Sequence, residues 1–537
     1  MPVINIDLDD LNRMLDDPIS ADDFSKIIIQ IGADPDEIND KEAMVEFFPD
    51  RPDLLSTEGV ARAVRAFTEQ KLGLIDYKTL PATTHMTVSP EVLNIRPFVL
   101  GGIVRGIKLD NIAIKSLMEL QEKLHVTLGR KRKKVSIGIH DLSKLKGPFK
   151  YGTCSPHEPA FVPLQKDYEM TPEEILKEHP KGIEYAHLLE DFEKYPLITD
   201  SKGEVASLPP IINGALTTIT DETTEILIDV TGLDGDVVED CLNIVAAALV
   251  ERGGEIEQLD IRYPTGKRIV PNMKPEIHKI DNNYVIDLLG YDPGNFDIFK
   301  AFRKCAMESD LKDEIWSVSV PAYRADILHP IDLLEEIAIG IGYDNIPENL
   351  PKETRFGEVL NSKKLERKCR EIMLGIGFQE AMTLTLTSTK ILHSNTGRME
   401  DGVATVSNPV TEDYHMLRSS ILPNLLELLV SNKHRELPQR IFEIGQVVKE
   451  HSNCISLAWI ELASKATFSR SKAINETITK RLGISGDYKE TDDPLFISGR
   501  GAQITTDEFK LVFGEINPKT LEKFELFYPA FGGEISW

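Results

Sequence analysis

The chain has 537 residues and a formal net charge of −26, with 41% hydrophobic and 28% charged residues. One core rarely serves so long a chain, so we expect several domains of ordinary globular composition. The acidic balance argues against a free-standing nucleic-acid binder, which needs a basic surface. No stretch resembles a signal peptide or a membrane span of roughly 18 residues. The five scattered cysteines predict no zinc site and fit a reducing compartment, so we expect a cytosolic protein without membrane contact.

We expect residues 1–75 to form a small α+β domain, and its clearest predicted element is a helix. The helix begins after Ser56, whose hydroxyl can cap the first turn. Its apolar residues recur at i, i+3, i+4 and i+7 and share one face: Val60, Ala63, Val64 and Phe67. The pattern predicts an amphipathic helix.

Residues 78–268 mix strands and helices and predict a second, α/β domain. The alternation of apolar and polar residues in 133–142 predicts a strand. The sequence of 236–254 predicts a helix with two glycines at its end. Residues 195–220 predict a hairpin closed at Ser201–Gly203.

One basic tract breaks the acidic trend of the chain. It reads GRKRKKV, with five cations in succession: Arg130, Lys131, Arg132, Lys133 and Lys134. Such a tract is either a solvated basic turn or a contact for phosphate groups. The sequence leaves both interpretations open.

Residues 270–347 begin with two short predicted helices, in 281–290 and 296–307, and end in a proline-rich linker. Residues 355–537 open with an amphipathic helix in 362–378. Four strand-like runs follow, at 380–388, 439–450, 454–462 and 509–516. Strand-rich sequence with interspersed helices predicts an antiparallel sheet with helices packed against it.

Four carboxylates cluster around the start of a further helix. Pro330 suits the first helical turn, and Asp332, Glu335 and Glu336 then share one face, with Asp326 just before them. The acids either complement the positive helix N-terminus, with one of them paired to the nearby arginine of PAYRAD, or hold a hard divalent cation such as Mg²⁺.

Four long motifs give the chain a specific resemblance. They are FFPDRPDLLSTEGVARAVRAF, PAYRADILHPIDLLEEIAIGIGYDNIP, SNPVTEDYHMLRSSILPNLLELLVSNK and RIFEIGQVV. Their order and spacing resemble the beta-subunit family of phenylalanyl-tRNA synthetases, in its archaeal and eukaryotic cytosolic form, over essentially the whole chain. The resemblance implies that a magnesium ion binds at the contact with the alpha subunit, on Asp326, Asp332, Glu335 and Glu336. It also implies a helix-turn-helix-like fold for residues 270–347.

The last domain lacks the marks of a working ATP site. A class II synthetase needs cations to balance the charge of phosphoryl and adenylate chemistry. The final segment, 511–537, has no GxGxGxxR pattern, and no P-loop or Rossmann fingerprint occurs elsewhere. We expect 355–537 to be a catalytically silent class II-like domain whose exposed apolar sheet surface packs against the catalytic alpha subunit.

The resemblance implies that residues 78–268 proofread. A hydrophobic pocket for phenylalanine cannot strongly reject tyrosine, so a second site must bind the extra hydroxyl. The family's editing residues fall on Leu197, Ser207, Asp229 and Thr231 here, and Asn213 is a further polar candidate.

Each editing residue also has a local interpretation. Asp229 and Thr231 could cap a strand-end turn at Gly232, and the Ser207 hydroxyl could be bonded locally. His140 and Asp141 are strand neighbours on opposite faces, so they form no dyad with each other, and a lone strand histidine is more often structural. We expect hydrolysis by a positioned water.

The leading interpretation is the beta subunit of a phenylalanine–tRNA ligase that works as an (alpha–beta)₂ assembly on tRNA(Phe), with ATP as substrate and Mg²⁺. The alternatives are a stand-alone editing deacylase and a non-enzymatic nucleic-acid-binding or scaffold protein. A requirement for a separate alpha chain, hydrolysis by the free chain and sequence-selective duplex binding would distinguish the three.

Overall fold

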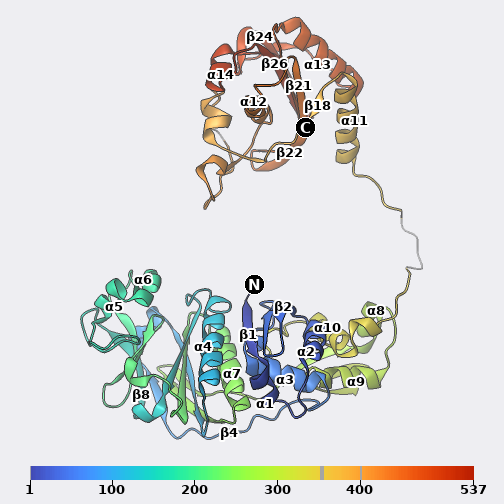
Figure 1. Cartoon of the computed structure of the whole chain (residues 1–537). Coiled ribbons are helices and arrows are strands. Elements are labelled where there is room, and N and C mark those ends of the chain that lie inside the picture. The colour runs from blue at the N-terminus through green and yellow to red at the C-terminus, as the bar shows by residue number, and fades with distance from the viewer. Residues whose placement is uncertain (1, 351–355, 400–401) are drawn as a thin grey trace. The chain divides into compact units, whose positions relative to one another are not determined.

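The chain forms two compact units, Met1–Leu350 and Pro351–Trp537 (Figure 1). The computed structural model describes residues 2–350, 356–399 and 402–537. Both units combine helices with sheets, which confirms a multi-domain chain of mixed helix and sheet. No helix in these described ranges is long and apolar enough to cross a membrane.

The N-terminal part of the first unit is a three-stranded sheet, ordered β1-β3-β2, with three helices. The predicted helix is α3, and Ser56 caps it by accepting a hydrogen bond from the Gly59 backbone N–H at 3.1 Å. Its apolar face is buried, as the i, i+3, i+4 pattern predicts. The elements are β1 (Val3–Asp7), α1 (Leu8–Arg13), α2 (Ala21–Ile31), β2 (Asp34–Ile38), β3 (Glu42–Glu46) and α3 (Thr57–Phe67).

An eleven-stranded mixed sheet follows, and its main path runs β11-β10-β9-β8-β5-β13-β6-β12-β7. Its strands are β4 (Thr79–Leu80), β5 (His85–Val88), β6 (Phe98–Arg105), β7 (Val135–Asp141), β8 (Phe149–Cys154), β9 (Tyr195–Thr199), β10 (Val205–Leu208), β11 (Ile212–Asn213), β12 (Glu225–Gly232), β13 (Glu255–Tyr263) and β14 (Gly266–Val270). Its helices are α4 (Asn111–Val126), α5 (Pro172–Glu178), α6 (Pro180–Tyr185) and α7 (Gly235–Glu251).

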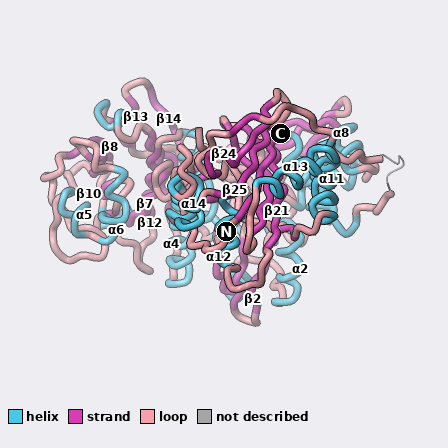
Figure 2. Tube along the Cα trace, turned by 90° about the horizontal axis from the view of Figure 1, so that it is seen from above, coloured by secondary structure: helices cyan, strands magenta, loops and turns pink. Residues whose placement is uncertain are grey.

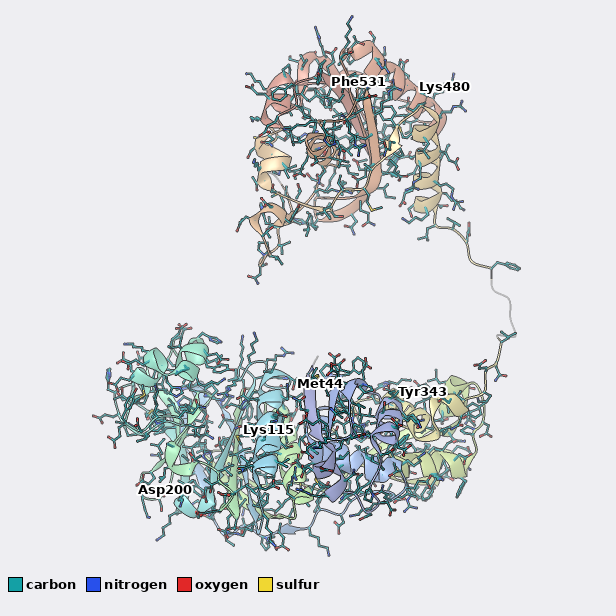
Figure 3. All side chains as sticks on the ribbon, in the orientation of Figure 1. Met44, Lys115, Asp200, Tyr343, Lys480 and Phe531 are labelled. Atoms are coloured by element: carbon teal, nitrogen blue, oxygen red, sulfur yellow. The ribbon has the colours of Figure 1, made fainter. Side chains whose placement is uncertain are left out.

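Two helices pack against the β6-β12-β7 end of this sheet. Helix α7 contacts β6 and β12, helix α4 contacts β7, and the two lie side by side in Figure 1. The predicted hairpin is β9–β10, and Asp200, labelled in Figure 3, accepts hydrogen bonds from the backbone N–H groups of its turn. The strand, helix and hairpin predicted in this region are therefore confirmed.

The first unit ends with a three-stranded antiparallel sheet, ordered β15-β17-β16, and three helices. The two predicted short helices are α8 and α9, and the helix after the acidic cluster is α10, which packs on α9. The elements are β15 (Glu276–Asp281), α8 (Asn282–Leu289), α9 (Asn295–Lys304), β16 (Glu308–Lys312), β17 (Ile315–Val320) and α10 (Pro330–Ile341).

The second unit is built on a seven-stranded sheet, ordered β18-β21-β22-β26-β25-β24-β23 and antiparallel except for the β18–β21 pair. A separate two-stranded pair joins β19 and β20. The elements are α11 (Asn361–Gly375), β18 (Gln379–Glu380), β19 (Leu386–Thr387), β20 (Met416–Leu417), α12 (Leu422–Ser431), β21 (Gln439–Lys449), β22 (Ser452–Leu462), α13 (Phe468–Leu482), β23 (Lys489–Glu490), β24 (Phe496–Thr505), β25 (Lys510–Ile516), α14 (Pro518–Lys523) and β26 (Ala530–Ser536).

Both faces of the seven-stranded sheet are covered, which corrects the predicted exposed sheet surface. Side chains of α12 and α14 belong to one core and those of α11 and α13 to the other, and Figure 2 shows the two pairs of helices on opposite sides of the sheet. Neighbouring residues of β22 alternate between the two cores, with Ile460 in one and Trp459 in the other. Phe531, labelled in Figure 3, is fully buried in β26. The unit therefore has a core on each side of its sheet.

The run 380–388 forms only short strand ends, although its alternation predicts a full strand. Its apolar side chains face solvent, with Met382 93% and Leu384 60% exposed. The alternating apolar and polar residues here give an exposed segment with apolar side chains on one side. Within the described residues, strand pairing reaches only the two ends of the run.

Candidate functional site

A cavity of about 1090 Å³, partly open to solvent, lies between α4 and the strands β7, β10, β11 and β12 of the first unit. Helix α4 contributes polar side chains to one wall, and the loop that joins β10 to β11 contributes two prolines to another. The residues on which the following argument depends are Gln121, His125, Arg132, Gly138, Ser207, Asn213 and Asp229.

A buried carboxylate, that of Asp229, lies at the inner end of this cavity. Its Oδ2 atom contacts the Nε2 atom of His140 at 2.6 Å and accepts a hydrogen bond from the Ser207 hydroxyl at 3.5 Å. The other ring nitrogen of His140 contacts the Thr217 hydroxyl at 2.8 Å. All four side chains are buried. The imidazole is therefore held at both nitrogens, and it fixes one oxygen of the carboxylate.

The glycine opposite Asp229 makes room for this arrangement. Gly138 of β7 pairs with Asp229 of β12 across the sheet. A Cβ atom at Gly138 would lie 2.0 Å from the Asp229 Oδ2 atom and 2.7 Å from the His140 Nε2 atom. Real Cβ atoms do not approach so closely, so glycine is required here if the carboxylate is to lie along the strand.

Three of the five predicted editing residues line the cavity together: Ser207, Asn213 and Asp229. The interpretation of Asp229 as a strand-end cap is wrong, because the residue lies inside an eight-residue strand and its carboxylate contacts His140. Ser207 is bonded to this carboxylate and not only to its own backbone. The absence of a dyad between His140 and its neighbour Asp141 is confirmed, since Asp141 caps the next turn instead.

The other two predicted editing residues lie elsewhere. Thr231 is buried beside the guanidinium of Arg96, whose Nε donates to its hydroxyl at 2.9 Å, and it is absent from the cavity lining. Leu197 lines a second cavity of about 800 Å³ with Gly152 and Cys154. Its strand pairs with β8, so that its side chain packs in the small core of the α5–α6 region.

Several residues of the cavity wall were not predicted from the sequence. His125 accepts a hydrogen bond from the Ile137 backbone N–H at 2.9 Å, and burial lowers its pKa. Arg132 donates to the Ile211 carbonyl at 2.8 Å and stacks over the Tyr185 ring. Only the basic tract gave a signal, and it did not distinguish Arg132 from its neighbours.

The acidic cluster lies around an arginine. Arg324 is buried and donates two hydrogen bonds to Asp326, at 2.8 and 2.6 Å, and two to Glu336, at 3.0 and 2.6 Å. Arg51, on the approach to α3, lies 3.8 Å from Glu336 and is itself paired with the buried Asp53. The pairing of an acid with Arg324, one of the two predicted alternatives, is therefore confirmed.

The two remaining acids have different environments. Asp332 accepts hydrogen bonds from the backbone N–H groups of Leu328 and His329 at 2.8 and 2.7 Å, all at one oxygen, and so caps α10. Partial burial, and then the negative charges of Glu336 and Asp50, raise the pKa of Glu335. Glu335 therefore lies in a field of negative charge.

The four carboxylates do not form a cation cage by themselves. Arg324 already neutralises two of them, and a guanidinium and a divalent cation cannot occupy the same place. Among the described residues, no group of three or more His, Cys, Asp or Glu side chains is arranged to hold a metal ion. Within the described residues, Asp332 and Glu335 are the two acids of the four that form no hydrogen bond with Arg324.

Known proteins resemble this chain over its full length. The phenylalanine–tRNA ligase beta subunit of Methanosarcina barkeri is 43% identical and aligns with 100% of this chain and 98% of its own length. That of Archaeoglobus fulgidus is 40% identical, with the same shares covered. This chain belongs to the phenylalanine–tRNA ligase beta-subunit family.

Models of the family's domains match along this member in order. They are the Phe-tRNA synthetase beta subunit B1 domain at 1–70, the B3/4 domain at 105–260, the tRNA synthetase B5 domain at 278–343 and the phenylalanyl tRNA synthetase beta chain CLM domain at 346–537. A crystal structure of an N-terminal fragment of the phenylalanyl-tRNA synthetase beta subunit from Pyrococcus horikoshii is 34% identical. It covers 63% of this chain and 99% of the fragment, with a TM-score of 0.62. The cavity and the acidic cluster thus lie in a fold that this family shares.

Proposed function

We propose that this chain is the beta subunit of a phenylalanine–tRNA ligase and that its large cavity hydrolyses tyrosyl-tRNA made in error. The observation that carries the proposal is the buried Asp229 carboxylate at the inner end of that cavity, fixed by His140. A buried acceptor discriminates strongly between substrates that do and do not pair with it.

Tyrosine and phenylalanine differ only in the hydroxyl that such an acceptor reads. The phenol of tyrosine donates a further hydrogen bond to Asp229, whereas phenylalanine offers no donor and leaves that acceptor position of the carboxylate unfilled and desolvated. Water then attacks the ester carbonyl carbon, the bond to the ribose oxygen breaks, and that oxygen takes up a proton. Ser207 and Asn213, on the same wall, orient the aminoacyl group.

The second unit, on this proposal, takes no part in adenylate chemistry. Arg418 is buried and paired with Glu443 at 2.7 Å, and Arg398 is paired with Asp493 at 2.6 Å. Both cations are neutralised within the unit, whereas an ATP site needs cations directed at phosphate. We propose a class II-like fold for this unit, supported by its largely antiparallel seven-stranded sheet. ATP and Mg²⁺ then act at the alpha subunit, within an (alpha–beta)₂ assembly that binds tRNA(Phe).

A surface on the second unit suits the contact with the alpha subunit. Exposed apolar side chains gather on segments joined by the β19–β20 pair and by the bond between the Val406 backbone N–H and the His415 carbonyl. They are Met382, Leu384, Leu386, Val406 and Tyr414. Several exposed apolar side chains on neighbouring segments are typical of an interface with another protein.

Charges placed on this surface should prevent assembly. We expect the Met382→Asp/Leu384→Asp variant to lose at least about 100-fold in affinity for the alpha subunit, because two carboxylates would be desolvated in the contact. Analytical ultracentrifugation of the mixed subunits measures this. Ile183→Asp, at an exposed apolar position of the first unit, is the matched control. Unchanged assembly of the double variant would place the contact elsewhere.

The predicted magnesium site remains a proposal in a narrower form. Glu335 and Asp332 would hold the ion at the contact with the alpha subunit, and the partner would supply further oxygen ligands. The pairing of Asp326 and Glu336 with Arg324 supports this narrower set, because it leaves Asp332 and Glu335 as the acids that the guanidinium does not bond. We also retain the four domains at 1–75, 78–268, 270–347 and 355–537, with a helix-turn-helix-like arrangement of α8 and α9, as predictions.

A methyl group at Gly138 should block editing without changing ligation. We expect Gly138→Ala to lower kcat/KM for tyrosyl-tRNA hydrolysis at least about 10-fold, because the Cβ atom would displace the Asp229 carboxylate. Gly375→Ala, in α11 of the second unit, is the control, because nothing lies within 4 Å of the new atom there and the backbone is helical. Equal hydrolysis by Gly138→Ala and the wild-type protein would contradict the role given to Asp229.

Reconstitution tests the proposed function as a whole. The chain is assayed alone and with its alpha subunit, for formation of phenylalanyl-tRNA and for hydrolysis of preformed tyrosyl-tRNA. We expect ligation only with the partner. A complex that assembles and cannot ligate would overturn the assignment as a ligase subunit.

A further inference from the structure

The turn that joins α4 to β7 has an unusual backbone. Three consecutive residues adopt left-handed conformations, with φ of 47° at Arg130, 55° at Lys131 and 62° at Arg132. Residues with side chains rarely adopt this region, and a run of three is disfavoured by sterics. Strained backbone of this kind persists only where the surrounding structure enforces it, and it is concentrated at functional sites.

Buried groups fix the turn from inside. Arg96 is buried and donates to the carbonyl groups of Arg132 and Lys133 at 3.2 and 3.3 Å. The Lys134 backbone N–H donates to the Gly129 carbonyl at 2.8 Å and closes the turn. A Cβ atom at Gly129 would lie 2.5 Å from the Val135 carbonyl oxygen, so the chain must be tightly folded here.

The five cations of this tract divide into two groups. Arg132 is buried in the cavity wall, and Lys134 is paired with Asp234 at 2.9 Å. The side chains of Arg130, Lys131 and Lys133 are exposed, and none of them forms an ion pair with any residue in the described ranges. In a chain with a net charge of −26, these three uncompensated cations form a local positive patch. We name Arg130, Lys131 and Lys133 the basic turn.

The basic turn lies at the edge of the editing cavity. Arg132, which lines the cavity, is the direct chain neighbour of Lys131 and Lys133. Adjacent Cα atoms are about 4 Å apart, so the backbone of Lys131 and of Lys133 adjoins a residue of the cavity wall. An ester substrate that enters this cavity carries the phosphates of its RNA strand outside it.

We propose that the basic turn is a binding surface for the RNA backbone, which holds the end of a mischarged tRNA so that its aminoacyl ester enters the cavity. This inference rests on the proposed editing function and extends it to the RNA part of the substrate. Because the turn fixes the backbone of the three residues, no chain segment has to become ordered when their cations bind phosphates. A merely solvated basic turn would need neither the left-handed run nor the buried Arg96.

The test removes the three charges together in the full chain assembled with its alpha subunit. The variant is Arg130→Gln/Lys131→Gln/Lys133→Gln, and hydrolysis of tyrosyl-tRNA is measured between 50 and 200 mM salt. We expect KM to rise about 10-fold or more, with kcat at saturating RNA unchanged. The slope of log KM against log salt should fall by about 2 to 3, since each lost phosphate contact contributes roughly 0.7 to 0.9.

The matched control is Lys267→Gln/Lys274→Gln/Lys279→Gln, which removes three exposed, unpaired lysines from the same unit. The inference is overturned if the basic-turn variant has the same KM and the same salt slope as this control. It is also overturned if the kcat of the basic-turn variant falls while its KM is unchanged. If the wild-type assembly does not hydrolyse tyrosyl-tRNA, the editing function fails. Fluorescence anisotropy with labelled tRNA then decides the RNA surface alone. Weaker binding by the basic-turn variant than by the control supports it, and equal binding overturns it.

Discussion

Asp229→Asn should abolish proofreading while it leaves ligation intact. We expect kcat/KM for tyrosyl-tRNA hydrolysis to fall about 100-fold or more, because an amide is a poorer acceptor and no longer pairs well with both His140 and the substrate hydroxyl. The assembled ligase, supplied with tyrosine, should then accumulate tyrosyl-tRNA. The rate of phenylalanyl-tRNA formation should not change, since on the proposed assignment ligation takes place at the alpha subunit and not in this cavity.

Two controls separate a local effect from loss of structure. Asp260→Asn changes a carboxylate of the same sheet outside the cavity, where it pairs with Arg262, and should hydrolyse normally. His140→Gln retains an N–H near the position of Nε2, whereas the shorter side chain of His140→Asn does not reach Asp229. We expect the glutamine variant to keep most of the selectivity for tyrosine over phenylalanine and the asparagine variant to lose it. Full activity of Asp229→Asn would remove the carboxylate from the site.

The second large effect concerns stability. Arg324→Met should lower the free energy of unfolding of the first unit by about 3–5 kcal/mol, because the buried Glu336 and the partly buried Asp326 lose the guanidinium that donates to both. Arg51, 3.8 Å from Glu336, is then the nearest remaining cation that the structure describes. Burial alone raises the pKa of Glu336, but Arg324 and Arg51 outweigh this, so that its pKa is lowered from the ordinary 4.5. The stability that ionised Glu336 contributes is thus present above pH 4.5. It is lost as the pH falls through the lowered pKa of Glu336. Calorimetry with hydrogen exchange over residues 45–70 and 315–341 locates the loss.

Arg268→Met is the matched control for this change. Its side chain is exposed and paired with Glu239, and surface pairs contribute about 0–1 kcal/mol. If Arg324→Met were as stable as this control, the guanidinium would not be the cation that the acids need. If Arg324→Met lost stability and Mg²⁺ restored it, a metal ion could take the place of the guanidinium. We expect added Mg²⁺ to leave the melting of the isolated chain unchanged.

Local patterns in the sequence predicted local structure well. The cap at Ser56, the end of α7 at its two glycines and the β9–β10 hairpin each depend on residues close together in the chain. The pair of Arg324 with an acid was also foreseeable, since the residues lie within one turn and its approach. The alternation of apolar and polar residues at 380–388 gave a wrong prediction of a full strand. The same alternation occurs in strands and in exposed segments with apolar side chains on one side.

The inner end of the cavity could not be predicted in the same way. Asp229 contacts His140 from the neighbouring strand, 89 residues away, and only the register of β7 against β12 brings them together. Thr231 lies beside Arg96, which comes from the segment before β6, and the pairing of β9 with β8 takes Leu197 out of the site. The arginine that fixes the basic turn comes from a different part of the chain. The sequence showed the positive charge of residues 130–134. It did not show which of the five side chains are bonded within the fold and which are exposed.

The most direct test of the account compares two esters on one enzyme. The chain assembled with its alpha subunit is given preformed tyrosyl-tRNA and phenylalanyl-tRNA, and the initial rates of hydrolysis are measured under the same conditions. We predict rapid hydrolysis of the tyrosyl ester, a rate at least about 100-fold lower for the phenylalanyl ester, and loss of this difference in Asp229→Asn. Equal rates for the two esters in the wild-type assembly, or hydrolysis of neither, would contradict the assignment of the cavity as an editing site.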